Sequence, residues 1–316
     1  MIAPLGIYLD NPTAASFFEM LEMPIFCNVL WPDRQAAQTC AKGDIKLAFD
    51  RQSGLIYNTA FDPDRLDYNP NYENSLDYSP RFQAYAQSLA ERLIDRYQLH
   101  YKTVIEIGCG KGDFLFLLCR LGANRGIGFD PSYIPQRLPA ALQGQVEVIR
   151  DFYSEQYADY QGDLIVCRHT LEHFQDPAAF LQMLRRSIGT RLDTCLFFEV
   201  PNAIDIFRRL AIWDILYEHC CYFSPIALRN YFSGCGFKVH RVTEDYQGQF
   251  LCLEATPAAQ PCPPDSDSVE MQQLEQDVLT FADKFHHKLN TWRIKLTQIA
   301  SQSQRAVVWG IGTKVV

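Results

Sequence analysis

The feature that most constrains the fold is a glycine-rich turn at residues 108–112, between a short apolar stretch and an amphipathic helix pattern. Glycine permits sharp turns with positive φ and lets the backbone approach a ligand closely. Asp130 follows Gly108 by 22 positions, at the end of the next apolar stretch, where a carboxylate can accept both hydroxyls of a ribose. This pattern predicts a nucleotide-type cofactor; the alternative is a turn that only packs a helix against a strand.

Strand-like and helix-like stretches alternate through the centre of the chain. The expected strands are residues 103–107, 126–130, 146–149, 163–167 and 195–200, and the expected helices are 113–121, 177–188 and 225–232. Such alternation is typical of a parallel sheet with helices on both faces. Two more strands, 237–242 and 249–255, are only six residues apart, so they should form an antiparallel hairpin. The predicted class is α/β, a Rossmann-like, mostly parallel sheet whose last strand is antiparallel.

Two cofactor classes use a glycine turn with an acidic residue at the next strand end, nicotinamide dinucleotides and S-adenosylmethionine. The dinucleotide fingerprint G-x-G-x-x-G needs a third glycine where Asp113 stands, and Glu106 precedes the turn. Two carboxylates at a helix N-terminus disfavour a pyrophosphate but tolerate a sulfonium and an amino acid. Together with the antiparallel hairpin, this favours S-adenosylmethionine.

Composition divides the chain into four regions. Residues 1–75 are irregular, 76–257 carry the α/β pattern, 258–268 form a linker, and 269–316 begin with a long helix. That helix should run from Val269 to about Gln304, because this stretch contains neither Gly nor Pro. Its apolar residues recur every three or four positions and share one face: Leu274, Val278, Phe281, Phe285, Leu289, Trp292, Leu296 and Ile299.

Composition also limits the function classes. Apolar residues make up 47% and charged residues 21% of the 316, as in a globular protein with a sizeable core. The net charge of −8 makes nucleic acid an unfavourable partner. Residues 1–12 lack the basic and apolar regions expected of a signal peptide, and no apolar run reaches the ~18 residues that a membrane helix needs. The eleven cysteines include no C-x-x-C pair, which favours reduced thiols and a cytoplasmic location.

Residues 104–115, Val-Ile-Glu-Ile-Gly-Cys-Gly-Lys-Gly-Asp-Phe-Leu, closely resemble the first motif of class I S-adenosylmethionine-dependent methyltransferases. The resemblance implies that the glycines line the methionine part of the cofactor and that Asp130 holds the ribose. Asp151 and Phe152 would flank the adenine by a hydrogen bond and by stacking, with a place in the core as the alternative for Phe152. The expected cofactor-binding residues are Glu106, Gly108, Gly110, Gly112, Asp130, Asp151, Phe152 and Arg168.

A wider resemblance is to the C-methyltransferases of natural-product and deoxysugar pathways, and residues 72–79, 169–173 and 217–224 carry it. Members of that family have an N-terminal zinc module, a central methyltransferase domain and a second nucleotide-type α/β domain. Asp50 and Ser53 stand where zinc-binding cysteines would be, so we expect no metal. Residues 307–314 resemble the opening of the second α/β domain, which implies that the chain is a truncated form of a longer protein.

Candidate catalytic residues follow the fourth and fifth predicted strands, whose carboxyl ends should border the cofactor crevice. A histidine with its ordinary pKa of about 6.5 suits proton abstraction at neutral pH. By resemblance, His219 is the base, Glu218 assists it, and His173 polarises a ketone. Tyr72 or Tyr78 would close the site, and neighbouring tyrosines would exclude water. The expected catalytic set is His219, Glu218, His173, Tyr217, Tyr222 and Tyr72.

The expected reaction is methylation of a carbon next to a carbonyl in a keto-sugar nucleotide or a related small molecule. The sugar enzymes have a tyrosine where Leu216 stands here, so the acceptor can differ. Two alternatives stay open: methylation of oxygen or nitrogen, and a non-catalytic remnant that only binds the cofactor. Neither a nucleic acid nor a membrane is expected as a partner.

Overall fold

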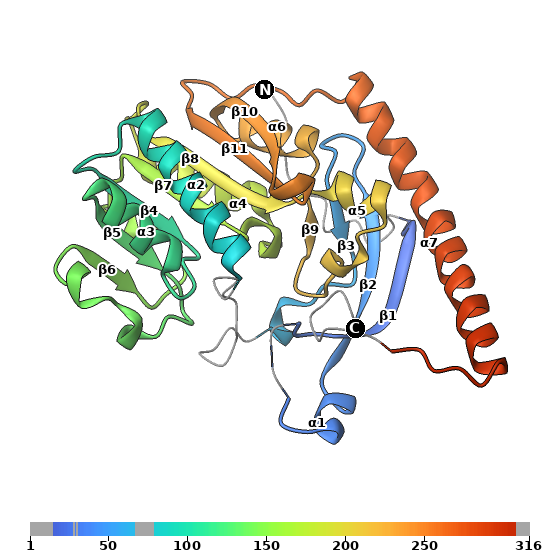
Figure 1. Ribbon diagram of the computed structural model, residues 1–316. Coiled ribbons are helices and arrows are strands. Elements are labelled where there is room, and N and C mark those ends of the chain that lie inside the picture. The colour runs from blue at the N-terminus through green and yellow to red at the C-terminus, as the bar shows by residue number, and fades with distance from the viewer. Residues whose placement is uncertain (1–14, 28, 30, 67–78, 308–316) are drawn as a thin grey trace.

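A twisted seven-stranded sheet forms the centre of the computed structural model, which describes residues 15–27, 29, 31–66 and 79–307 (Figure 1). The strands are β4 (Thr103–Ile107), β5 (Arg125–Phe129), β6 (Val146–Ile149), β7 (Leu164–Arg168), β8 (Cys195–Pro201), β10 (Phe237–Asp245) and β11 (Phe250–Pro257). Their order is β10-β11-β8-β7-β4-β5-β6. Neighbours from β8 to β6 are parallel, whereas β11 is antiparallel to both β8 and β10. The predicted α/β class and the terminal hairpin are confirmed.

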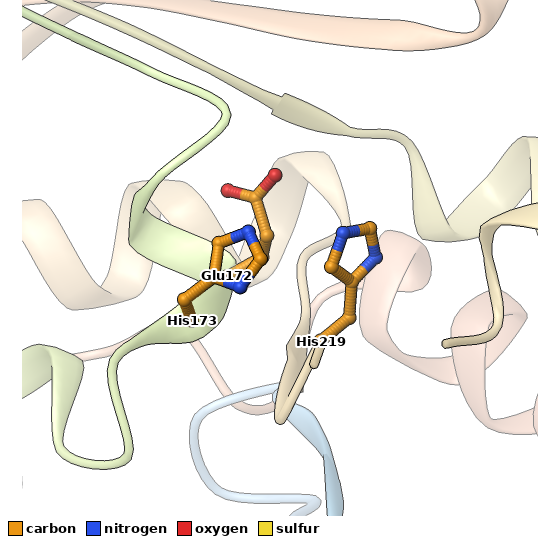
Figure 2. Close-up of side chains that lie close together, drawn as sticks. All are labelled: Glu172, His173 and His219. Atoms are coloured by element: carbon orange, nitrogen blue, oxygen red, sulfur yellow. The ribbon is translucent and has the colours of Figure 1, made fainter. Parts of the chain in front are cut away.

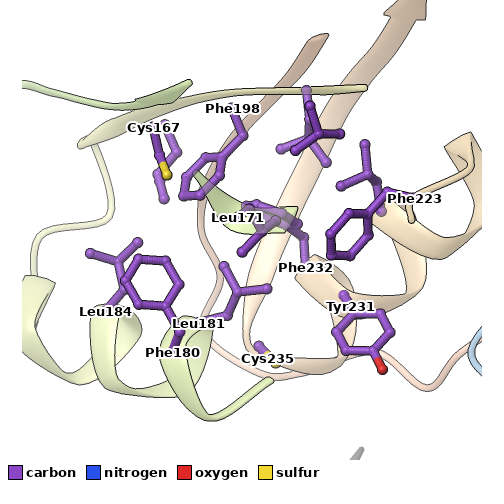
Figure 3. Packing of buried hydrophobic residues seen from close by; sticks show 14 of the residues in the cluster. Cys167, Leu171, Phe180, Leu181, Leu184, Phe198, Phe223, Tyr231, Phe232 and Cys235 are labelled. Carbon is purple, nitrogen blue, oxygen red and sulfur yellow. The ribbon is translucent and has the colours of Figure 1, made fainter. Parts of the chain in front are cut away.

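Helices cover both faces of this sheet because its strands are apolar on both sides. Ile105 faces a cluster with α4 (Pro177–Ile188) and α6 (Pro225–Gly234), and its neighbour Val104 faces a cluster with α2 (Pro80–Tyr97) and α3 (Asp113–Gly122). Helix α4 begins at the predicted residue, since the Asp176 side chain accepts the Ala179 N–H and a proline follows it. Figure 3 shows Leu171, fully buried between Phe198 and Leu181 of the first cluster.

The sequence suggested that residues 1–75 are irregular, but the described part of this region, within residues 15–66, contributes most of a second sheet. Strands β1 (Phe18–Pro24), β2 (Lys42–Phe49) and β3 (Ile56–Asn58) pair antiparallel, and a short helix, α1 (Arg34–Gln38), precedes β2. The fourth strand, β9 (Cys221–Tyr222), comes from the segment between β8 and α6 and pairs with β3. The N-terminal segment is therefore joined to the central region by a strand pairing.

The long helix α7 (Val269–Ser301) packs along this second sheet, together with α5 (Ala203–Arg209) (Figure 1). Phe281 contacts Phe18 of β1 at a ring-centroid distance of 4.9 Å and Phe207 of α5 at 4.7 Å. Only the first half of the predicted apolar face is buried, since Trp292 is 52% exposed. Within the described residues, no helix has the length and apolarity needed to span a membrane.

Candidate active site

A cavity of about 640 Å³ opens at the carboxyl ends of four parallel strands. Its wall includes the last residue of each of these strands: Ile107 of β4, Phe129 of β5, Arg168 of β7 and Pro201 of β8. The wall continues through the turn at 108–111 and through residues 169, 170 and 172–174 to His219. Open α/β sheets bind their ligands in this position.

The glycine turn has the backbone geometry that requires glycine. The φ angles of Gly108, Gly110 and Gly112 are +70°, +54° and +87°. A Cβ on Gly108 would stand 2.2 Å from Oγ1 of Thr170, and one on Gly112 would stand 2.4 Å from the ring of Phe116. Gly108 and Gly110 line the cavity, whereas Gly112 forms the N-cap of α3. The turn therefore presents bare backbone to a ligand.

Asp130 borders the cavity and also holds the glycine turn in place. Its Oδ2 accepts the Gly110 N–H at 2.8 Å, and its Oδ1 accepts the N–H and the hydroxyl of Ser132 at 2.8 and 2.6 Å. The carboxylate is only 8% exposed. Removing it would loosen the turn and strand a buried N–H, in addition to any effect on a ribose.

Glu106 is a buried carboxyl at the floor of the cavity. One of its oxygens, Oε2, has no hydrogen-bond partner among the described residues. Burial raises the pKa of Glu106 to about 8, against the opposing effect of the Arg168 charge. The group is thus largely protonated at neutral pH and would lose its proton to accommodate a cationic ligand group.

The predicted adenine residues lie on the cavity wall after β6. Phe152 is 62% exposed, so its core alternative is excluded and its ring can stack on a ligand. Asp151 accepts hydrogen bonds from Gln156 at 3.1 Å and from the Tyr157 hydroxyl at 2.6 Å. Its carboxylate therefore anchors the loop that carries Phe152.

Arg168 ends β7 and lies over the ring of Phe114 at 4.1 Å. Its guanidinium donates to Glu199 of β8 at 3.0 Å, and the Tyr85 hydroxyl donates to the same carboxylate. Although burial acts to raise it, Arg168 and His169 hold the pKa of Glu199 below its usual range. Sequence analysis missed Glu199, whose only local signal is a single carboxylate within an apolar strand.

Two imidazoles meet at the far wall of the cavity (Figure 2). The rings of His173 and His219 are 5.0 Å apart between centroids, at an interplanar angle of 83°. Nδ1 of His219 lies 3.1 Å from the Asp214 carbonyl oxygen, and the backbone of Glu218 hydrogen-bonds His173. Burial lowers the pKa of His219 to about 4 and that of His173 well below its usual value. Both rings are therefore neutral at physiological pH.

Glu172 lies beside the imidazoles, and its role was not assigned from the sequence. It belongs to a one-turn 3-10 helix, Leu171–His173, which the buried Leu171 fixes against the core. The residue is 2% exposed, and neither carboxyl oxygen has a hydrogen-bond partner among the described residues. Nδ1 of His169 is 3.9 Å from Oε1. Burial raises the pKa of Glu172 to about 7.

Three residues of the predicted catalytic set point away from the cavity. The Glu218 carboxylate accepts the Cys27 N–H at 2.9 Å, so it does not assist His219. The Tyr217 hydroxyl accepts the Asp62 N–H, and the Tyr222 hydroxyl donates to the Leu216 carbonyl. The reason is the pairing of β9 with β3, which turns these side chains into the core of the second sheet.

Two further predicted residues, Tyr72 and Tyr78, lie outside the described part of the chain.

The expected zinc-module positions form a hydrogen-bonded turn between β2 and β3. Oδ2 of Asp50 accepts the N–H of Ser53 at 3.1 Å and also its hydroxyl, and Oδ1 accepts the N–H of Gln52. Only Cys27 and Cys40 offer thiols in the described N-terminal region, fewer than the four soft ligands of a structural zinc site. The residues present do not fit that metal, and its absence stays a prediction.

Comparison with known families decides the class of the protein. Residues 81–242, just over half of the chain, match a family described as a methyltransferase domain. The chain belongs to this methyltransferase family. Membership confirms the predicted S-adenosylmethionine-dependent methyltransferase, whereas the narrower sugar C-methyltransferase family with a zinc module is not established by it.

Two curated relatives of this methyltransferase are tRNA U34 carboxymethyltransferases. The one from Campylobacter hominis is 31% identical over 151 residues, which cover 44% of this chain and 52% of the relative. The one from Dichelobacter nodosus is 32% identical over 103 residues, which cover 31% of this chain and 33% of the relative. The methyltransferase thus spans about half or less of the length of these relatives.

Two solved structures that match part of the chain are methyltransferases, with TM-scores below 0.5. The magnesium protoporphyrin IX methyltransferase of Synechocystis with bound SAH is 18% identical, with a TM-score of 0.42, covering 56% of this chain and 84% of that one. A methyltransferase of calicheamicin biosynthesis, also with SAH, is 16% identical, with a TM-score of 0.41, covering 62% and 65%.

Proposed function

We propose that this methyltransferase binds S-adenosylmethionine along the turn at 108–112 and methylates a small molecule held against Glu172, His173 and His219. The observation that carries the proposal is one continuous cavity. The glycine turn, Asp130 and Phe152 line it, and so do the buried carboxyl and the two imidazoles. The methyl donor and the methyl acceptor could therefore meet inside this cavity without crossing solvent.

The donor half of the cavity fits the chemistry of this cofactor. When bound, S-adenosylmethionine supplies a methyl group on a positively charged sulfonium. The backbone of Gly108 and Gly110 lines the cavity where its amino-acid part would lie, and the exposed ring of Phe152 can stack on its base. The Glu106 carboxyl, whose Oε2 has no partner among the described residues, can receive a cationic group.

The acceptor half supports removal of a proton from the acceptor. Both imidazoles are uncharged at pH 7, and the anchoring of His219 at Nδ1 by Asp214 leaves Nε2 as the nitrogen that would take the proton. Because burial lowers the pKa of His219 to about 4, this ring is a weaker base than an exposed histidine. The finer proposal is carbon methylation next to a carbonyl of a keto-sugar nucleotide or related metabolite. The base would remove the proton beside the carbonyl, and the resulting enolate carbon would take the methyl group.

Incubation of the full chain with methyl-labelled S-adenosylmethionine and a panel of keto sugars, in D₂O, tests this function. We expect deuterium at the carbon next to the carbonyl and label in the product, both lost in His219→Ala. Label on oxygen or nitrogen without deuterium exchange would replace carbon methylation by the alternative reaction. Failure to bind the cofactor or its demethylated thioether would contradict the function itself.

The curated relatives motivate a second candidate, a tRNA substrate. The net charge of −8 argues against an extended phosphate-binding face. The same assay with unmodified tRNA in place of the ketone separates the two candidates. Transfer of label to tRNA at low salt, without transfer of label to any keto sugar, would favour the tRNA substrate.

A further inference from the structure

We propose that Glu172, His173 and His219 bind a divalent transition-metal ion that holds an oxygen atom of the methyl acceptor. The metal site itself does not depend on the proposed function; only the statement that the ion holds the methyl acceptor rests on it. The three side chains each offer one ligand atom, and these atoms all lie within 4.8 Å of one another (Figure 2).

The spacing is close to that of a bound ion. At metal–ligand distances of about 2.0–2.1 Å, neighbouring ligand atoms of a tetrahedral site stand roughly 3.4 Å apart. The ligand atoms would therefore need to approach one another by up to about 1.4 Å, which small torsional changes of the side chains provide. The 3-10 helix that carries Glu172 and His173 is fixed by the buried Leu171, so its two ligands arrive on a rigid turn.

The imidazoles have the surroundings of metal-binding histidines. Such histidines usually donate their second N–H to a backbone carbonyl or a carboxylate, which fixes the tautomer and orients the ring. His219 lies 3.1 Å from the Asp214 carbonyl oxygen through Nδ1, and His173 is hydrogen-bonded to the Glu218 backbone. For His219, whose Nδ1 is anchored, Nε2 is the nitrogen that would coordinate the ion.

The carboxyl of Glu172 supplies an independent reason. Both of its oxygens are buried and lack hydrogen-bond partners among the described residues, a costly arrangement for a polar group. A cation at the site would satisfy them. His169, 3.9 Å from Oε1 and 2.6 Å from Glu199, would then position this carboxylate from behind.

The donor set indicates the class of metal and its task. Two imidazole nitrogens and one carboxylate suit Mn²⁺, Fe²⁺, Co²⁺ or Zn²⁺ better than Mg²⁺ or Ca²⁺, which prefer oxygen. Three protein ligands leave at least one position open for a substrate oxygen. The ion would polarise the acceptor's carbonyl or hydroxyl and make its proton acidic enough to pass to solvent water. In the metal-loaded protein, His219 would therefore act as a ligand, and it would act as the base only without the metal.

The test is titration of the chelator-treated full chain with Co²⁺, followed by visible absorption and by calorimetry. We expect one Co²⁺ per chain with ligand-field bands, and at least tenfold weaker binding in both Glu172→Gln and His219→Ala. His240→Ala, which changes an exposed histidine, should bind Co²⁺ as the wild type does. Binding of S-adenosylhomocysteine to each variant, measured in parallel, separates loss of a ligand from loss of the fold.

Absence of saturable Co²⁺ binding, or wild-type binding by a folded His219→Ala, would overturn the metal site. So would full methyl transfer by metal-free protein in the presence of a chelator, a result that leaves the proposed function intact. Tight Co²⁺ binding without transfer to any acceptor would instead contradict the proposed function and retain the site.

Discussion

The imidazole of His173 stands almost perpendicular to that of His219, with the ring centroids 5.0 Å apart. Burial keeps the pKa of each ring below its ordinary value, so the pair enters the cavity wall uncharged. Two protonated rings at this distance would repel each other in a poorly solvated place. A neutral pair, in contrast, can accept a proton or bind a cation.

Substitution His219→Ala should lower methyl transfer by about 100- to 10,000-fold, the usual contribution of a positioned acid–base group, and it would also lower transfer if His219 holds the ion that polarises the acceptor. Affinity for S-adenosylmethionine should hardly change, because the glycine turn and Asp130 build the donor site. Single-turnover rates and titration calorimetry measure the two quantities. Parallel loss of both would mean that His219 has a structural role, and near-normal turnover would assign the proton transfer to another group.

Substitution Asp130→Ala should weaken S-adenosylmethionine binding by at least tenfold. It removes the acceptor of the Gly110 N–H and of both Ser132 donors, and hydrogen bonds to a charged group contribute about 1.5–3 kcal/mol each. Calorimetry with S-adenosylhomocysteine gives the dissociation constant. Asp95→Ala, on the exposed side of α2, is the matched control. Unchanged affinity in Asp130→Ala would remove this residue from the donor site.

Binding of S-adenosylmethionine at pH 7 should release a proton from Glu106. Burial raises the pKa of this group to about 8 in the ligand-free protein, and a cationic ligand favours its charged form. Because the pKa of Glu106 is higher in the folded protein than in the unfolded chain, protonation of Glu106 stabilises the fold at low pH, and this stabilisation is lost as the pH rises through 8. Calorimetry in two buffers of different ionisation enthalpy counts the protons. Equal release by Glu106→Gln would contradict the assignment.

Any metal that the protein binds should be insensitive to the N-terminal turn. Cys40→Ser combined with Asp50→Asn should leave the metal content unchanged, because the Asp50 oxygens accept hydrogen bonds within their own turn and asparagine keeps one of these two accepting oxygens. Elemental analysis after dialysis measures the content. Loss of the metal in this double variant would revive a zinc site in the first 75 residues.

Local signals predicted the parts of the fold that local chemistry determines. The glycine turn, the extent of α4 and the short β10–β11 connection each follow from adjacent residues, and all three were confirmed. The pairing of β9 with β3 could not be predicted in this way. In this pairing Ile56 lies opposite Tyr222 and Tyr57 opposite Cys221. Because β9 has two residues and β3 has three, neither strand is long enough to show a period-two pattern in the sequence.

The direction of side chains explains the errors at the site. His219 and Glu218 are adjacent, and the sequence alone suggested that they act together. The backbone sends one into the cavity and the other towards Cys27, because β9 begins two positions after His219. Glu172 lies within the motif at 169–173, but its local sequence offered no reason to assign it a role. Its burial and the lack of hydrogen-bond partners for its carboxyl oxygens among the described residues become evident only in the structure.

The strand pairing between β3 and β9 has a consequence for how such a protein can diversify. The segment that carries His219 is clamped by the N-terminal sheet, whereas the glycine turn, Asp130 and Phe152 belong to the central sheet and its loops. Mutations in residues 15–66 could reshape the pocket for a new acceptor while leaving the machinery for the donor untouched. The donor site and the acceptor site thus rest on different sheets, so the acceptor site can change without a change in the donor site.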